Sequence, residues 1–101
     1  MKLEFYPVEK LKKEVAEIIF RHLDRNTYHV LFFGSRVSGK SHERSDIDVG
    51  IEGPGKIPSD VFLQIKEEIE NLPTLYTIDV VDFRRVAPSF REIALLEHES
   101  I

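Results

Sequence analysis

The chain has 101 residues, so we expect residues 1–101 to form one small domain around a single hydrophobic core. A hydrophobic content of 42% excludes the disordered class, and a net charge of −4 argues against a general nucleic-acid binder, which needs a basic face. The absence of cysteine excludes a disulfide scaffold and a thiolate metal site. No signal-peptide core or run of roughly 20 apolar residues is present, so we predict a cytoplasmic protein.

The first predicted element is an amphipathic helix over residues 7–23, opened by Pro7. Its apolar residues recur at three- and four-residue steps: Val8, Leu11, Val15, Ile18, Ile19 and Leu23. A continuous apolar run at residues 29–33, ending at Gly34, predicts a buried strand. The polar, basic segment 35–45 is expected to be a loop that begins with one helical turn at Ser35, where backbone N–H groups could face an anion.

The second half of the chain predicts one further strand, a helix, a third strand and a last helix. Residues 46–52 alternate between polar and apolar and predict a half-buried strand. After a Gly-Pro-Gly turn, Ser59 or Asp60 is expected to cap a helix that Pro73 ends. Residues 75–83 are rich in β-formers, and Ser89 with Glu92 matches the capping box of a helix reaching residue 98. The predicted order is therefore α-β-β-α-β-α.

Residues 34–41, GSRVSGKS, satisfy the pattern of a P-loop and follow a predicted strand. A P-loop must run into a helix whose first turn completes the phosphate cradle. Only four residues separate this segment from the strand that begins at Asp46, which leaves no room for such a helix. We therefore reject a P-loop phosphohydrolase.

Asp46 and Asp48 indicate a metal-dependent site. They lie two residues apart in a predicted strand, so their side chains share one face and can converge on one ion. Carboxylates held this close repel each other unless a cation neutralises them, and hard oxygen ligands favour Mg²⁺ or Mn²⁺. Solvated strand-edge aspartates are the plain alternative. The nearby Gly-Ser turn with Arg36 and Lys40 favours a phosphate site, which needs donors and cations opposite the metals.

A third metal ligand is expected from the strand YTIDVVDF. Asp79 is flanked by apolar residues, where an unpaired charge is costly, whereas Asp82 lies at the strand end, where exposure costs little. We therefore predict Asp79 as the ligand and Asp82 as a surface or end-of-strand residue. The alternation of a strand places the two on opposite faces, so both cannot readily serve one centre.

The segment GSRVSGKSHERSDIDVGIE, followed by YTIDVVDF, resembles the minimal nucleotidyltransferases of the DNA polymerase beta superfamily. These are small proteins usually encoded beside a HEPN-domain partner. The resemblance implies an α+β fold in which a mixed sheet has its helices packed on one side. It also implies that Gly34 and Ser35 contact the nucleotide phosphates, and that Arg36 matches an arginine often found after this pair. Gly50 is a departure, since many relatives carry a larger apolar residue there.

The same resemblance assigns Asp46, Asp48 and Asp79 as the three metal-binding carboxylates. It implies transfer of AMP from ATP, assisted by two Mg²⁺ ions, with Mn²⁺ as a substitute. Relatives act as antitoxins that adenylylate a tyrosine of a HEPN ribonuclease toxin, so an ATP substrate and a HEPN partner are expected. The alternative is a catalytically inactive antitoxin that neutralises its toxin by binding alone.

Overall fold

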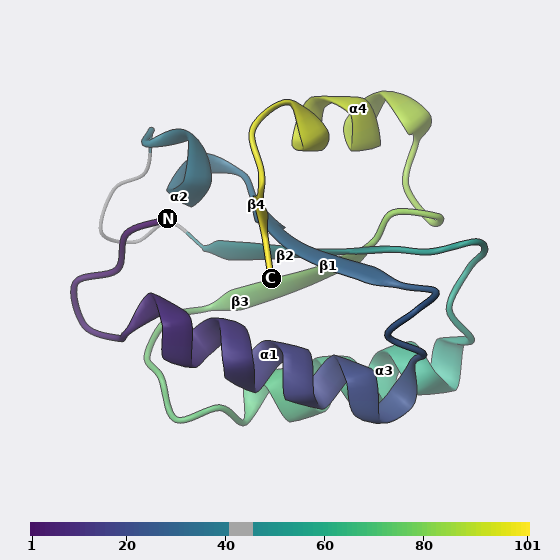
Figure 1. The fold of residues 1–101 in the computed structure, drawn as a ribbon, viewed down its shortest axis with the longest axis horizontal. Coiled ribbons are helices and arrows are strands. Elements are labelled where there is room, and N and C mark those ends of the chain that lie inside the picture. Colours follow the sequence, from purple (N-terminus) through teal and green to yellow (C-terminus); the bar gives the residue numbers. More distant parts are fainter. Residues whose placement is uncertain (41–45) are drawn as a thin grey trace.

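The computed structural model describes residues 1–40 and 46–101, which form a four-stranded mixed sheet with helices (Figure 1). The strand order is β3-β2-β1-β4; β1 is antiparallel to β2 and to β4, while β2 and β3 are parallel. The predicted α+β class is therefore confirmed. The elements are α1 (Val8–His22), β1 (His29–Phe33), α2 (Ser35–Ser38), β2 (Ile47–Glu52), α3 (Ser59–Glu70), β3 (Ile78–Asp82), α4 (Pro88–Leu96) and β4 (Glu99–Ser100).

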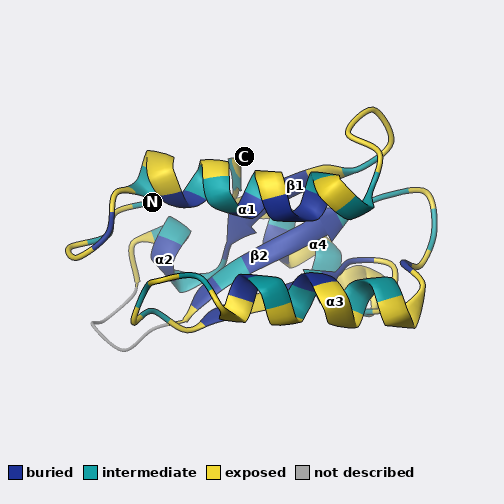
Figure 2. Ribbon diagram, turned by 90° about the horizontal axis from the view of Figure 1, so that it is seen from below, coloured by how far each residue is buried: buried dark blue, intermediate teal, exposed yellow. Residues whose placement is uncertain are grey.

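Helices α1 and α3 cover one face of the sheet and enclose the main core. Figure 2 shows the buried stripes of the two helices turned toward each other and toward the strands. The apolar spacing predicted for the first helix supplies this stripe, because residues three and four positions apart lie on one side of a helix. The fully buried side chains of this core include Leu11, Val15, Ile19, Phe32, Val49, Ile51, Ile65 and Ile69.

The opposite face of the sheet is partly covered by α4 (Figure 1). A second, smaller cluster lies there, formed by Leu31, Phe33, Phe83 and Ala94. The expectation of helices on one side therefore holds for α1 and α3, whereas α4 occupies the other side. Within α4 only Ala94 is buried, so the helix covers the sheet without filling the space beneath it.

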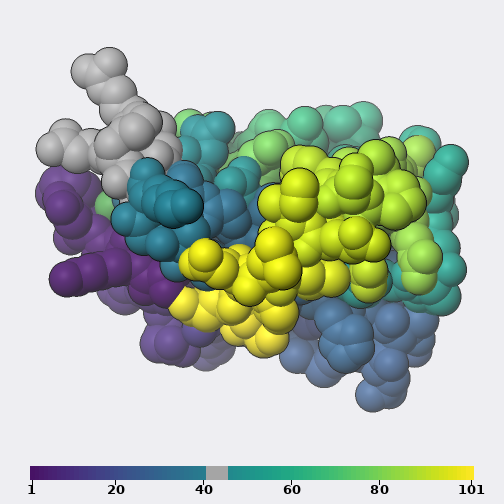
Figure 3. Space-filling model, turned by 90° about the horizontal axis from the view of Figure 1, so that it is seen from above, coloured from purple at the N-terminus to yellow at the C-terminus, as the bar shows by residue number. Residues whose placement is uncertain are grey.

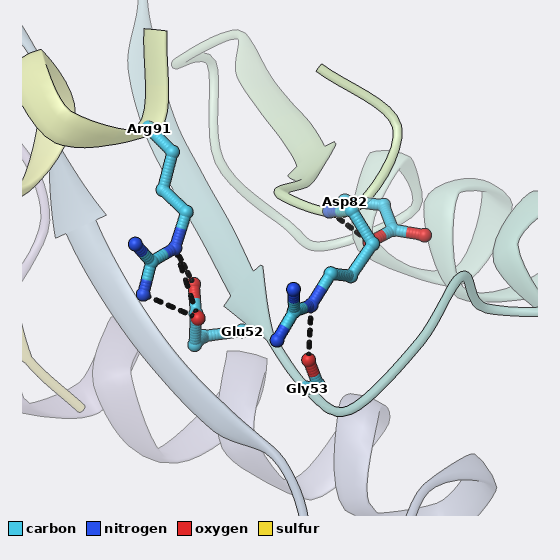
Figure 4. A network of polar contacts seen from close by, with 5 residues as sticks. Glu52, Gly53, Asp82 and Arg91 are labelled. Carbon is cyan, nitrogen blue, oxygen red and sulfur yellow. Dashed lines mark hydrogen bonds and ion pairs between the residues drawn. The ribbon is translucent and has the colours of Figure 1, made fainter. Parts of the chain in front are cut away.

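Two arginines hold the segment around α4 against the end of β2 (Figure 4). Arg91 of α4 donates from Nε to both carboxylate oxygens of Glu52 at 2.9 and 2.8 Å, and from Nη2 at 2.7 Å. Arg84 donates from Nε to the Gly53 carbonyl at 2.6 Å. A fork of parallel charge-assisted hydrogen bonds fixes orientation as well as distance. This contact therefore anchors α4 at the far end of β2 from Asp48.

Several predicted boundaries differ from the structure. Helix α3 begins at Ser59 with Pro58 as its N-cap and no side-chain cap, and it ends at Glu70, before Pro73. The predicted capping box is wrong, because α4 begins at Pro88 and Ser89 lies inside the helix. Strand β4 was not predicted: the chain leaves the helix after Leu96 and pairs with the free edge of β1. No helix among the described residues has the length and apolar character needed to cross a membrane.

Candidate active site

Asp48 and Asp79 lie at one end of the sheet, where three neighbouring strands begin or end. Strand β1 terminates at this end, while β2 and β3 begin there, since β1 is antiparallel to β2 and β3 is parallel to it. The register places Asp48 directly between Phe33 of β1 and Asp79 of β3. Neighbouring strands lie about 4.8 Å apart, so the two carboxylates are adjacent on the face that also carries α4.

Gly34 lies against the carboxylate of Asp48. Its backbone has φ 82° and ψ −164°, a conformation that side-chain-bearing residues rarely adopt. A Cβ atom at this position would lie 2.1 Å from Asp48 Oδ2. The Gly34 carbonyl then accepts hydrogen bonds from the N–H groups of Val37 and Ser38, both at 3.1 Å, and so starts the short turn α2. Only glycine at position 34 therefore lets the backbone leave β1 this close to the Asp48 carboxylate.

The carboxyl group of Asp48 has a raised pKa. Burial, and after it the negative charges of Asp79 and Asp46, together raise its pKa from the ordinary 3.8 to about 6. Asp46 and Asp79 themselves are exposed. Oxygen donors with this much mutual repulsion fit a divalent cation, which would relieve it. Among the described residues, however, no three His, Cys, Asp or Glu side chains are gathered closely enough to hold a metal ion.

Asp82 was predicted as a surface or end-of-strand residue; its place at the strand end is confirmed, whereas a surface position is wrong. It is the last residue of β3, but only 3% exposed, and its carboxylate accepts hydrogen bonds at 2.9 Å from the N–H groups of Ile57 and Arg84. Arg85 Nε lies 3.4 Å from its Oδ2. The buried charge is thus compensated by donors that no sequence pattern revealed. The predicted opposite orientation is confirmed, because Asp79 is exposed on the face of Asp48 while Asp82 is buried on the other.

Arg36 and Lys40 do not share one environment. Arg36 is buried, and its guanidinium lies over the ring of Tyr76 at 5.0 Å from the centroid. Lys40 is exposed and follows the turn, where its N–H donates to the Ser35 carbonyl at 3.1 Å. Their contact with nucleotide phosphates stays a prediction. The last residue of the P-loop pattern, Ser41, lies outside the described residues.

The rejection of a P-loop agrees with the backbone. Helix α2 has only four residues and ends at Ser38; its C-cap is Gly39, whose φ of 80° is left-handed. Strand β2 then returns antiparallel to β1. A P-loop instead requires a long helix directly after the glycine-rich turn. The Gly-Ser turn therefore does not form a P-loop.

A pocket of about 560 Å³ opens beside the two paired carboxylates. One end is polar and is lined by Gly34, Ser38, Asp48 and Asp79. The other end is lined mainly by α4, with Phe33, Phe90, Ile93, Ala94, Leu96 and Glu97. None of the site residues predicted from the sequence lies in α4. The signal that could have revealed it is the three-residue spacing of Phe90, Ile93 and Leu96, all three of which are exposed.

A mixed sheet with paired aspartates beside a glycine turn defines the nucleotidyltransferase class. The family model described as "Polymerase beta, Nucleotidyltransferase" matches residues 13–101. The chain therefore belongs to this nucleotidyltransferase family, which confirms the resemblance drawn from its motifs. No curated protein matches the sequence significantly.

Solved structures share the fold. A chain of a toxin-antitoxin crystal structure with AMP-PNP is similar with a TM-score of 0.71 and 15% identity, over 88% of this chain and 70% of that chain. A chain from the complex of the tri-AMPylated Shewanella oneidensis HEPN toxin with MNT antitoxin gives 0.69 and 11%, over 91% and 69%. A protein assigned as a minimal nucleotidyltransferase gives 0.69 and 25%, over 98% of both chains.

Proposed function

We propose that this chain transfers AMP from ATP to a hydroxyl group of a partner protein, a HEPN toxin, and thereby acts as its antitoxin. The observation that carries the proposal is the pairing of Asp48 with Asp79 across β2 and β3, beside a glycine that leaves room for no side chain. The similar complexes with AMP-PNP and with a tri-AMPylated HEPN toxin support the choice of nucleotide and partner.

Asp46, Asp48 and Asp79 are the residues that would hold two Mg²⁺ or Mn²⁺ ions. Bound ions of this kind neutralise phosphate charge and make a nearby hydroxyl easier to deprotonate. The Gly34–Ser35 turn brings backbone close to the carboxylates, where phosphate oxygens would have to lie. In the transfer, the acceptor oxygen bonds to the α-phosphorus, the bond to the β-phosphate oxygen breaks and pyrophosphate leaves. We assign Asp79, which is exposed, as the carboxylate that accepts the hydroxyl proton.

The acceptor must come from another molecule that can reach an exposed site. Asp46 and Asp79 are both accessible, and the pocket beside them is open at the surface. A tyrosine is suited to this geometry, because its hydroxyl stands at the end of a long rigid ring. The proposed acceptor is therefore a tyrosine side chain presented by the HEPN partner.

The test is the intact mass of the HEPN partner after incubation with this chain, ATP and Mg²⁺. We expect a gain of one or more adenylate units, which is lost with Asp48→Asn. The matched control is Asp60→Asn, because Asp60 is an exposed aspartate of α3 outside the site. Transfer by Asp48→Asn at the parental rate would show that the site assignment is wrong.

The second candidate is an antitoxin that acts by binding alone. It is favoured by one observation, that among residues 1–40 and 46–101 no three potential ligands already converge on a metal position. It predicts that the double variant Asp46→Asn, Asp48→Asn neutralises the toxin at equal molar dose without ATP. An unchanged partner mass together with a tight complex would select this candidate.

A further inference from the structure

The pocket beside the carboxylates has two chemically different ends. At the polar end, Asp48 and Asp79 lie next to the Gly34 turn; at the other end, α4 presents Phe90 and Ile93. Figure 3 views this face, where α4 and the segment after it lie beside α2. Its volume of about 560 Å³ is in the usual range for a small-molecule site. A ligand that fills it needs one charged end and one flat or apolar end.

The ring of Phe90 is held in a fixed orientation at the apolar end. It meets Phe33 edge to face, with centroids 5.9 Å apart and an interplanar angle of 88°. Phe33 is itself buried and packs against Phe83 at 5.4 Å. Despite this support, 44% of Phe90 remains exposed. The residue therefore offers a rigid aromatic surface that the core does not use.

The position of this ring relative to the carboxylates is set by the sheet. Phe33, the support of Phe90, is the register partner of Asp48 on β1. Arg91, the residue after Phe90, is anchored to Glu52 at the other end of β2. Both ends of the pocket are thus linked to β2, one through the Phe33–Asp48 register pair and the other through the Arg91–Glu52 contact.

We propose that Phe90 stacks against the base of the nucleotide whose phosphates lie at the Gly34 and Asp48 end. This inference rests on the proposed function. It adds a subsite for the base, which the proposed function does not specify. Every nucleobase has a flat π-face that can stack on an aromatic ring, so the contact accepts a nucleoside triphosphate without selecting strongly among bases. The base would thereby be bound by α4, the last helix of the chain.

The test compares two ligands that differ in having a base: Mg²⁺–ATP and Mg²⁺–tripolyphosphate. Calorimetric titration measures the affinity of both for the parent, Phe90→Ala and Phe90→Tyr. We expect Phe90→Ala to weaken ATP binding roughly tenfold while tripolyphosphate binding is unchanged, and Phe90→Tyr to restore ATP binding. The matched control is Leu75→Ala, since Leu75 is a fully exposed apolar residue that lines a different hollow.

The other outcomes overturn the inference in distinguishable ways. Equal weakening of both ligands by Phe90→Ala, or a lowered unfolding midpoint that accounts for the loss, would show a structural role for the ring. Unchanged ATP affinity with a weaker partner complex would show that α4 contacts the partner instead. If the parent binds ATP and Phe90→Ala binds it equally, only the base subsite fails. If the parent binds neither ligand, the proposed function fails with it.

Discussion

Replacing Asp48 with asparagine should stabilise the metal-free protein while removing its proposed activity. The raised pKa, from 3.8 to about 6, means that the folded state disfavours the ionised carboxylate. One pKa unit corresponds to about 1.4 kcal/mol, and because Asp48 is only half-buried, solvent screening reduces the cost of its ionisation in the fold to about 1–2 kcal/mol. Asparagine has nearly the same shape and carries no charge. The gain is therefore electrostatic and has a defined pH dependence.

The sign follows from proton linkage. A group whose pKa is higher in the folded state contributes stability at low pH, and this contribution disappears as the pH rises through the folded pKa. The metal-free parent should therefore lose stability between about pH 4 and pH 7 relative to Asp48→Asn. Below about pH 4 the two proteins should be nearly equal, since Asp48 is then protonated in both states.

Urea denaturation in EDTA at a series of pH values measures this difference in the free energy of unfolding. The matched control is Asp60→Asn, which removes a charge from the first turn of α3 and should therefore lose up to about 1 kcal/mol of stability at neutral pH, opposite in sign to the gain of Asp48→Asn. Added Mg²⁺–ATP should reverse the order, because ligand binding to the folded state stabilises only a protein that retains the site. A variant less stable than the parent at pH 8, or a difference that is the same at pH 4 and pH 8, would refute the electrostatic reasoning.

Three further predictions follow from the contacts of individual residues. Gly34→Ala places a Cβ 2.1 Å from Asp48 Oδ2, so it should both lower the urea midpoint and abolish transfer; retention of transfer would show that the turn can move. Gly50→Ala places a Cβ 2.4 Å from the Phe83 ring and should destabilise the fold by about 1–3 kcal/mol. An unchanged urea midpoint would contradict this and show that the ring rotates away. Asp82→Ala leaves two backbone donors unpaired and should destabilise the fold by about 2–4 kcal/mol; faster amide exchange at those two donors is the direct check, and unchanged exchange would contradict it.

The local pattern of the sequence was sufficient for the elements that build the main core. The strand at His29–Phe33 has the predicted bounds, and α1 differs from its predicted range by one residue at each end. The fold class and the family followed from the Gly-Ser turn and the spaced aspartates. The shared face predicted for Asp46 and Asp48 stays a prediction, because β2 begins at Ile47 and Asp46 lies just before the strand.

The burial of the two aspartates in β3 is the opposite of what the sequence predicts. The apolar neighbours of Asp79 predict a buried carboxylate, whereas Asp79 is exposed and Asp82 is the buried one. The choice of Asp79 stays a prediction for a different reason, its position beside Asp48. Flanking residues predict which face of the strand a side chain occupies. Whether that face is buried depends on helices and loops from elsewhere in the chain.

The sequence by itself determined the strands β1, β2 and β3, the amphipathic helices and the family of this protein, because each depends on neighbours within a few residues. The tertiary structure alone decided the parallel register that sets Asp79 against Asp48, the donors that surround Asp82, and the placement of α4 over the opposite face. These depend on contacts between residues far apart in the chain, whose geometry is fixed only when the sheet has formed and the helices have packed against it.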